Sequence, residues 1–147
     1  MIDNASLLAL IENPLELPLL TLDEFFSDNQ EEDSLAPNQW GYGRPTLAEI
    51  HQRLILIEQR DDVAWVRVQL HEDTVWENAD GTLSCPDGAV GEAIAICAHR
   101  STSTMTLAEA ANTDWMESDG VIEGWANRAT RIPEIPTGFR VTSLVWD

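Results

Sequence analysis

The sequence predicts an α/β domain of the α+β type, in which helices pack on one mixed or antiparallel sheet as a two-layer sandwich. The first observation behind this class is a helical pattern in residues 47–59, where apolar residues recur at spacings of three and four. The second is a set of strand-like segments, residues 63–70, 93–98 and 139–146. The 147 residues, 44% of them hydrophobic, are enough for one domain with a single core.

The helix starts are marked by a repeated pattern, Thr-Leu-x-Glu, at Thr21, Thr46 and Thr106. In this pattern the Thr hydroxyl accepts from the backbone N–H three residues on, while the Glu side chain accepts from the Thr N–H. We therefore expect three helices, each beginning after one of these threonines. The second is the clearest, because Pro45 directly precedes it. Its predicted buried positions are Leu47, Ile50, Leu54 and Ile57.

Three strands are expected to form most of the sheet. Residues 63–70 (VAWVRVQL) alternate so that one face is wholly apolar. Residues 93–98 are apolar throughout, which predicts a central strand that is buried on both faces. Residues 139–146 alternate again and complete the sheet late in the chain. Between the first two strands, Asp80 and Gly81 predict the turn of a small hairpin.

The charge of the chain restricts its partners. Against 26 acidic residues stand 8 basic ones, all of them Arg, for a formal net charge of −18. A field of this sign repels phosphate backbones and anionic membranes, which argues against nucleic-acid and membrane-surface binding. A basic protein partner or a cation is compatible with it. The same acidity is also typical of a surface that only keeps a protein soluble.

The negative charge is concentrated at the beginning of the chain. Residues 1–43 contain nine acids and no base, which is half of the net charge. The same region is too rich in Leu, Ile and Phe to be a disordered acidic tail. We therefore expect a single domain, residues 1–147, in which an acidic helical and loop segment, 1–45, packs on an α/β core, 46–147.

The stretch TLDEFFSDNQEEDS, residues 21–34, raises the question of what its uncompensated acids do. Asp23 and Glu24 fall in the first turn of a predicted helix, where the helix dipole favours negative charge. The acids beyond it have no evident structural task and are free for a partner. Two aromatic residues follow between flexible glycines, and they either contact a ligand or tuck into the core to fix the path of the loop. The predicted partner-binding residues are Asp28, Glu31, Glu32, Asp33, Trp40 and Tyr42.

No catalytic motif is found, and we expect neither an enzyme nor a bound cofactor or metal. His71 and Asp73 share a face of a predicted strand end, but two ligands from one strand do not make a metal site. Cys97 lies in the apolar strand and is expected to be buried, while Cys85 lies in a turn. Two such cysteines do not indicate a disulfide framework. The start of the chain lacks the pattern of a secretory signal, and no apolar run is long enough to span a membrane, which predicts a cytoplasmic protein.

Several segments together resemble a set of small, acidic, uncharacterised bacterial proteins. They are LLTLDEFFSDN, DSLAPN, the long run from LAEIHQRLILIEQ to HEDTVW, VIEGW and the closing VTSLVWD. Those proteins are similar to the immunity partners that neutralise polymorphic or contact-dependent toxins. The resemblance implies an immunity-type inhibitor that occludes a basic toxin or effector domain through an acidic face. Two alternatives stay open: a general acidic interaction, regulatory or nucleic-acid-mimicking domain, and a hydrolase that uses scattered carboxylates.

Overall fold

The computed structural model of the chain describes residues 1–146, and its centre is a five-stranded sheet. In spatial order the strands are β2 (Leu20–Thr21), β3 (Val63–Leu70), β6 (Gly91–His99), β9 (Phe139–Val145) and β7 (Gly120–Glu123). Every neighbouring pair in this sheet is antiparallel. The prediction of mixed helices and strands around an antiparallel sheet is therefore confirmed.

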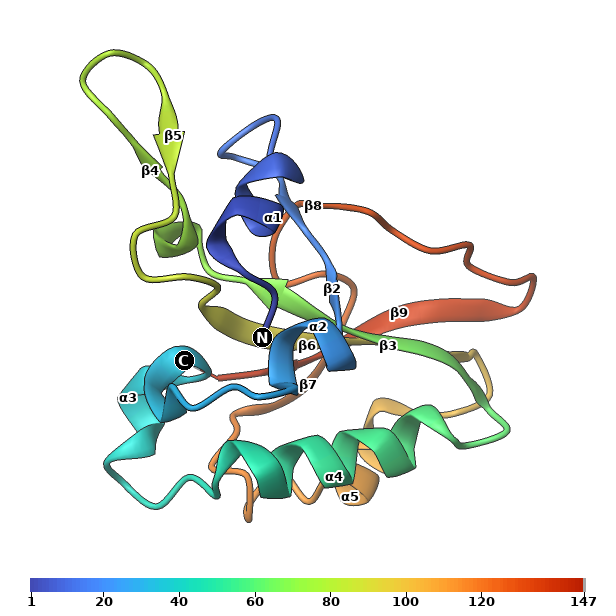
Figure 1. Ribbon diagram of the computed structural model, residues 1–147. Coiled ribbons are helices and arrows are strands. Elements are labelled where there is room, and N and C mark those ends of the chain that lie inside the picture. The colour runs from blue at the N-terminus through green and yellow to red at the C-terminus, as the bar shows by residue number, and fades with distance from the viewer. Residues whose placement is uncertain (147) are drawn as a thin grey trace.

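Two smaller strand pairs accompany the main sheet. The strand β1 (Leu17–Pro18) pairs in parallel with β8 (Ala129–Thr130). The strands β4 (Trp76–Glu77) and β5 (Leu83–Ser84) form the hairpin predicted from the Asp-Gly turn, and it projects from the body of the molecule (Figure 1). The helices are α1 (Asn4–Ala9), α2 (Leu22–Phe26), α3 (Pro37–Trp40), α4 (Leu47–Glu58) and α5 (Thr104–Ala111), with 3₁₀ turns η1 (Glu32–Ser34) and η2 (Glu72–Thr74).

The helix α4 forms where the sequence predicts it and buries the predicted face. Thr46 and Glu49 make a complete capping box at its start. Its four predicted positions, Leu47, Ile50, Leu54 and Ile57, are buried and share one core with the inward residues of β3 and β6. The capping box at Thr21 is also confirmed. The predicted start at Thr106 is wrong, because α5 begins at Thr104 and Ser103 accepts from the N–H of Thr106 instead.

The strands lie where the sequence predicts them, but not every residue points to the predicted face of the sheet. The run at residues 93–98 lies in β6, the third of five strands, and is buried throughout. In β3 the simple alternation fails at Ala64, which is exposed, because the pairing with β6 shifts register between Val63 and Trp65. This bulge lets Val63 face the same core as Val66, which strict alternation forbids.

The two faces of the sheet are covered by different material. Figure 1 shows α4 and α5 on one side of the sheet and the connection between β7 and β9 on the other side. The helical side holds the main core. On the opposite side a smaller cluster includes Trp65 and Cys97, and Trp125 stacks on Trp65 from the covering segment. Both cysteines are free and buried, so Cys85 is more deeply placed than its turn position indicated.

The N-terminal segment packs on the sheet at Gly91. The backbone N–H of Ala36 donates to the carbonyl of Gly91, and Leu35 forms an isolated bridge to the same residue. A Cβ at Gly91 would lie 2.9 Å from a methyl carbon of Leu35 and 3.2 Å from the ring of Phe25. A larger residue at this position would force these buried side chains to shift, so glycine favours the close approach of the acidic segment to the sheet.

Asp62 links two loops that lie at the same end of the sheet, where β3 begins and β6 ends. Its carboxylate accepts from Nε and Nη2 of Arg60, at 2.9 Å each, and from the hydroxyl of Thr102 at 2.8 Å. The hydrogen bonds from Arg60 lower the pKa of Asp62 from 3.8 to about 2, against an opposing effect of burial. The backbone carbonyl of Asp62 also accepts from the N–H of His99. This carboxylate ties the turn after α4 to the loop after β6.

Within residues 1–146 no helix is long and apolar enough to cross a membrane.

Candidate functional site: an acidic groove

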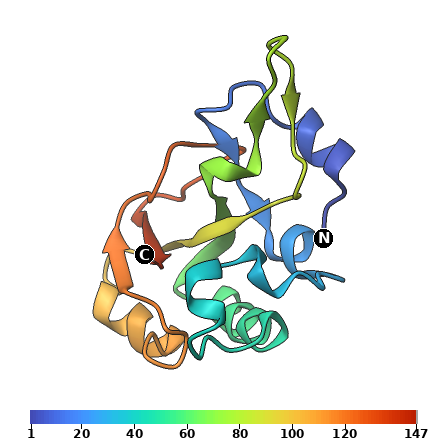
Figure 2. The same ribbon diagram turned by 90° about the vertical axis from the view of Figure 1, so that its left-hand side faces the viewer.

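The candidate functional site is a surface groove with a volume of about 710 Å³. It lies between the η1–α3 segment and the base of the β4–β5 hairpin. Figure 2 faces this side of the molecule, with the hairpin above and the η1–α3 segment below. Four carboxylates line it, from Glu31, Asp33, Asp73 and Asp87. We call this feature the acidic groove.

The walls of the acidic groove are partly apolar. They include Met1, Pro37, Trp76, Pro86 and Val90. None of the lining residues is an arginine, and the amino terminus of Met1 is the one cationic group that they contribute. Apolar walls lower the local dielectric, so that the potential of the four carboxylates is focused on whatever enters. Such a surface favours a ligand that combines positive charge with aliphatic or planar groups.

A second cavity, of about 370 Å³, adjoins the acidic groove and shares Pro37, Asp73 and Val90 with it. Its wall adds Glu92, a half-buried residue of β6. Burial raises the pKa of the Glu92 carboxyl, although His71 nearby acts in the opposite direction. The Oε1 atom of Glu92 is buried and has no hydrogen-bond partner among the described residues.

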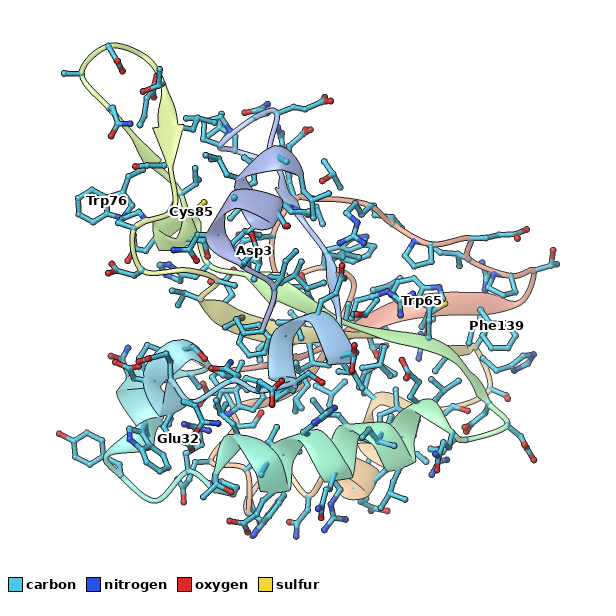
Figure 3. All side chains as sticks on the ribbon, viewed as in Figure 1. Asp3, Glu32, Trp65, Trp76, Cys85 and Phe139 are labelled. Atoms are coloured by element: carbon cyan, nitrogen blue, oxygen red, sulfur yellow. The ribbon has the colours of Figure 1, made fainter. Side chains whose placement is uncertain are left out.

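Trp76 is the exposed aromatic residue of the acidic groove. It belongs to β4, opposite Ser84, and 57% of its surface is exposed. Figure 3 shows its ring standing out from the base of the hairpin, away from the core. An indole in this position offers a flat face for stacking beside the carboxylates.

The acids that the sequence analysis predicted to bind a partner differ in where they lie. Glu31 and Asp33 line the acidic groove, whereas Asp28 is exposed but does not line it. Asp28 has a positive φ of 55°, so it also serves to turn the chain.

The prediction that Glu32 has no structural task is wrong. Its carboxylate accepts from the backbone N–H of Leu47 at 3.0 Å, at the first turn of α4. It also lies 3.9 Å from Nη2 of Arg44, whose side chain is 0% exposed. Arg44 donates to the backbone carbonyls of Glu32 and Pro45, and burial lowers its pKa. Glu32 therefore neutralises a buried cation and holds the start of α4.

Trp40 and Tyr42 lie outside the acidic groove. Trp40 is 37% exposed and carries the guanidinium of Arg44 over its ring, 4.7 Å from the centroid. Trp40 thus covers Arg44 with part of its ring. It neither lies free to contact a ligand nor tucks fully into the core, which were the two roles that the sequence suggested. Tyr42 is 84% exposed in the connection to α4. Trp40 ends α3 and Tyr42 follows it, and neither residue lines the acidic groove or the adjoining cavity.

The residues weighed as metal ligands are arranged differently from the prediction. The strand ends at Leu70, and His71 caps the 3₁₀ turn η2 by accepting from the N–H of Asp73 at Nδ1. Its Nε2 lies 3.9 Å from Glu92. In the described part of the chain, no group of three His, Cys, Asp or Glu residues could hold a metal ion.

Half of the acidic groove could not be found from sequence patterns. Asp73, Trp76 and Asp87 join Glu31 and Asp33 only because the hairpin folds back beside η1. A partial signal was present, since Trp76 stands next to acidic Glu77 in a short polar hairpin with no core pattern. Nothing in the spacing of residues indicated that this hairpin faces the N-terminal segment.

The fold and the groove define a small acidic α+β protein with an open, negatively charged groove. Residues 3–144 match the family described as "Uncharacterized protein YfbO family", and the chain belongs to this family. Neither a curated protein nor a solved structure matches the chain.

Proposed function

We propose that the protein is a non-enzymatic binding protein that holds a basic segment of a partner protein in the acidic groove. The observation that carries this proposal is the convergence of four carboxylates, from segments far apart in the chain, on one groove without an arginine. Scattered surface acids that only favour solubility have no need to gather on one concave face. Convergence on a concave face with apolar walls is typical of a binding surface.

The net charge of −18 supports the same role. A field of this size steers a basic partner towards the groove and raises the rate of association. Like charges repel acidic competitors, so the field also contributes to specificity.

Within this proposal the partner is a basic toxin or effector domain, as the resemblance to immunity proteins implies. The protein then acts in the bacterial cytoplasm by covering a positively charged surface that the partner needs for its activity. The helices and the antiparallel sheet serve as a rigid two-layer sandwich that carries the groove. Rigid support matters because a groove built from several segments binds well only when its walls are held in place.

The test uses two charge-matched variants. The first neutralises the acidic groove with Glu31→Gln, Asp33→Asn, Asp73→Asn and Asp87→Asn. The second neutralises four exposed acids elsewhere, Asp61→Asn, Glu109→Gln, Asp114→Asn and Glu134→Gln. Glu32 is left intact in both variants, because it has a structural task.

A partner is first isolated with the tagged parent protein, and its association rate is then measured for all three proteins at two ionic strengths. We expect the groove variant to associate at least about tenfold more slowly at low salt and to show a flatter salt dependence. The control variant should change far less, although its net charge is the same. Equal slowing of the two variants would show that the overall charge acts and that the groove has no special part.

A further inference from the structure

We propose that the acidic groove recognises arginine: a guanidinium of the partner stacks on Trp76 and pairs with the carboxylate of Asp73 or Asp87. The arginine is carried on an extended segment of the partner protein. This inference rests on the proposed function, and it specifies the chemistry of the partner.

Four carboxylates from different segments of the chain line one cavity of about 710 Å³. A peptide segment can place a separate cationic side chain near each carboxylate. The adjoining cavity, which Glu92 also lines, extends this path.

Other tryptophans of this chain show how a guanidinium can stack on an indole ring. Three of them already carry an arginine of the chain over their rings, with the guanidinium carbon 4.7 Å from the centroid at Trp40, 5.2 Å at Trp115 and 5.9 Å at Trp65. Within residues 1–146 Trp76 has no such partner, although it is more exposed than Trp40. Its ring and the neighbouring carboxylates therefore offer the two contacts that a guanidinium makes best.

Arginine suits this site better than lysine for a geometric reason. The guanidinium is planar, so it can stack on an aromatic face and still donate two parallel hydrogen bonds to a carboxylate. An ammonium is a compact and strongly hydrated charge that pairs with the carboxylates but gains less from the ring. Trp76 should therefore set the preference between the two cations, whereas the acids should set the overall affinity.

The experiment measures binding of two labelled peptides by fluorescence anisotropy at about 20 mM salt. The probes are acetyl-Gly-Arg-Gly-Arg-Gly-Arg-Gly-amide and the same peptide with three lysines, so that their charges are equal. The proteins are the parent, Trp76→Leu, Trp76→Phe, and the control Tyr42→Leu, which removes an exposed aromatic residue outside the acidic groove. The groove and control charge variants described above complete the set.

We expect the parent to bind the arginine peptide about three- to tenfold more tightly than the lysine peptide, as a cation–π contact implies. Trp76→Leu should remove this preference, Trp76→Phe should restore most of it, and Tyr42→Leu should leave it unchanged. The groove charge variant should weaken both peptides by about tenfold or more, and the control charge variant by much less.

The outcomes separate the two proposals. Equal binding of the two peptides by the parent, with both weakened in the groove charge variant, would overturn arginine recognition and leave the acidic groove as a binding site. Equal affinities in the groove and control charge variants would overturn the site itself, and arginine recognition with it. Absence of binding to either peptide would have the same consequence.

Discussion

Neutralising Glu32 is expected to destabilise the fold, whereas the same change at its neighbour Glu31 is not. The substitutions Glu32→Gln and Glu31→Gln remove one charge each and preserve side-chain size. Glu31 is exposed and lines the acidic groove. Glu32 lies 3.9 Å from Nη2 of Arg44, a guanidinium with no exposed side-chain surface. The pair of variants therefore compares a charge that meets solvent with a charge that compensates a buried cation.

The magnitude follows from the distance and the exposure. At 3.9 Å and an effective dielectric constant of about 20, the attraction between the two charges is about 4 kcal/mol. Glu32 keeps 30% of its side chain exposed, so screening reduces this value. The glutamine oxygen can still accept from the N–H of Leu47, which preserves the hydrogen bond to α4. We expect a loss of about 1–3 kcal/mol in the free energy of unfolding for Glu32→Gln, and less than about 0.5 kcal/mol for Glu31→Gln.

The assay is unfolding in urea, which does not screen charges, and tryptophan fluorescence monitors the transition. A thermal melt gives an independent reading, since about 2 kcal/mol corresponds to about 4–8 °C in a chain of this size. Parent, Glu31→Gln and Glu32→Gln are compared under one buffer condition. If the two variants have the same stability within 0.5 kcal/mol, the reasoning about Arg44 is refuted, and Glu32 belongs with the free acids after all.

Four further outcomes are expected. Leu54→Ala should cost about 2–5 kcal/mol in urea unfolding, because Leu54 is fully buried on α4, and a loss below 0.5 kcal/mol would contradict the packing of that helix. Asp62→Asn should lower the free energy of unfolding by about 1–2 kcal/mol at pH 7. Because the folded-state pKa of Asp62 is depressed to about 2, its charge stabilises the fold fully above about pH 4, and the difference in stability between variant and parent should close between pH 4 and pH 2. A gap that persists at pH 2 would show that the charge of Asp62 is not the cause. Glu92→Gln should raise the free energy of unfolding at pH 7 by a few tenths to about 1 kcal/mol. Because the folded-state pKa of Glu92 is raised, the charged carboxylate destabilises the fold only as the pH rises through that pKa, and the gain in stability from Glu92→Gln should vanish below about pH 4. A gain that does not depend on pH would point to another cause. Thiol titration of the unreduced, denatured protein should find two free groups, since both cysteines are unpaired, and a count of zero would reveal a disulfide.

Local patterns predicted the helical side of the fold well. The face of α4 follows from the period of its apolar residues, and its start follows from the capping box at Thr46. The central place of β6 follows from an apolar run that only a strand covered on both sides can carry. In each case the signal and the structure lie within one short segment, so no knowledge of distant contacts was needed.

One error was local, and two arose where a second segment decides the outcome. Ser103 competes with Thr106 for the start of α5, and both residues carry a hydroxyl that can cap a helix. The bulge at Ala64 depends on the register with β6, which the period of one strand does not contain. Local patterns predict a free acid at Glu32, because its partners, Arg44 and Leu47, are 12 and 15 residues away along the chain.

The candidate site was half predictable for the same reason. The sequence pointed to the acids that precede α3, because they had no cation near them in the chain. It could not indicate Asp73, Trp76 or Asp87, since their place beside Glu31 depends on how the β4–β5 hairpin is oriented. Charge composition thus indicated the kind of partner, whereas the long-range packing determined which acids face it.

The acidic groove is assembled from parts of the chain that meet only when the whole domain is folded. Its walls come from the amino terminus, from residues 31–37, from residues 73–76 and from residues 86–90, and the contact at Gly91 holds one wall against the sheet. A partner that binds this groove has no equivalent site on the unfolded chain, so its binding energy adds to the stability of the folded state. At a free partner concentration of about 100 times Kd the gain is about 2.7 kcal/mol, or a rise of about 5–10 °C in Tm. A thermal-shift screen of basic proteins and peptides can therefore detect the natural partner without any assay of activity.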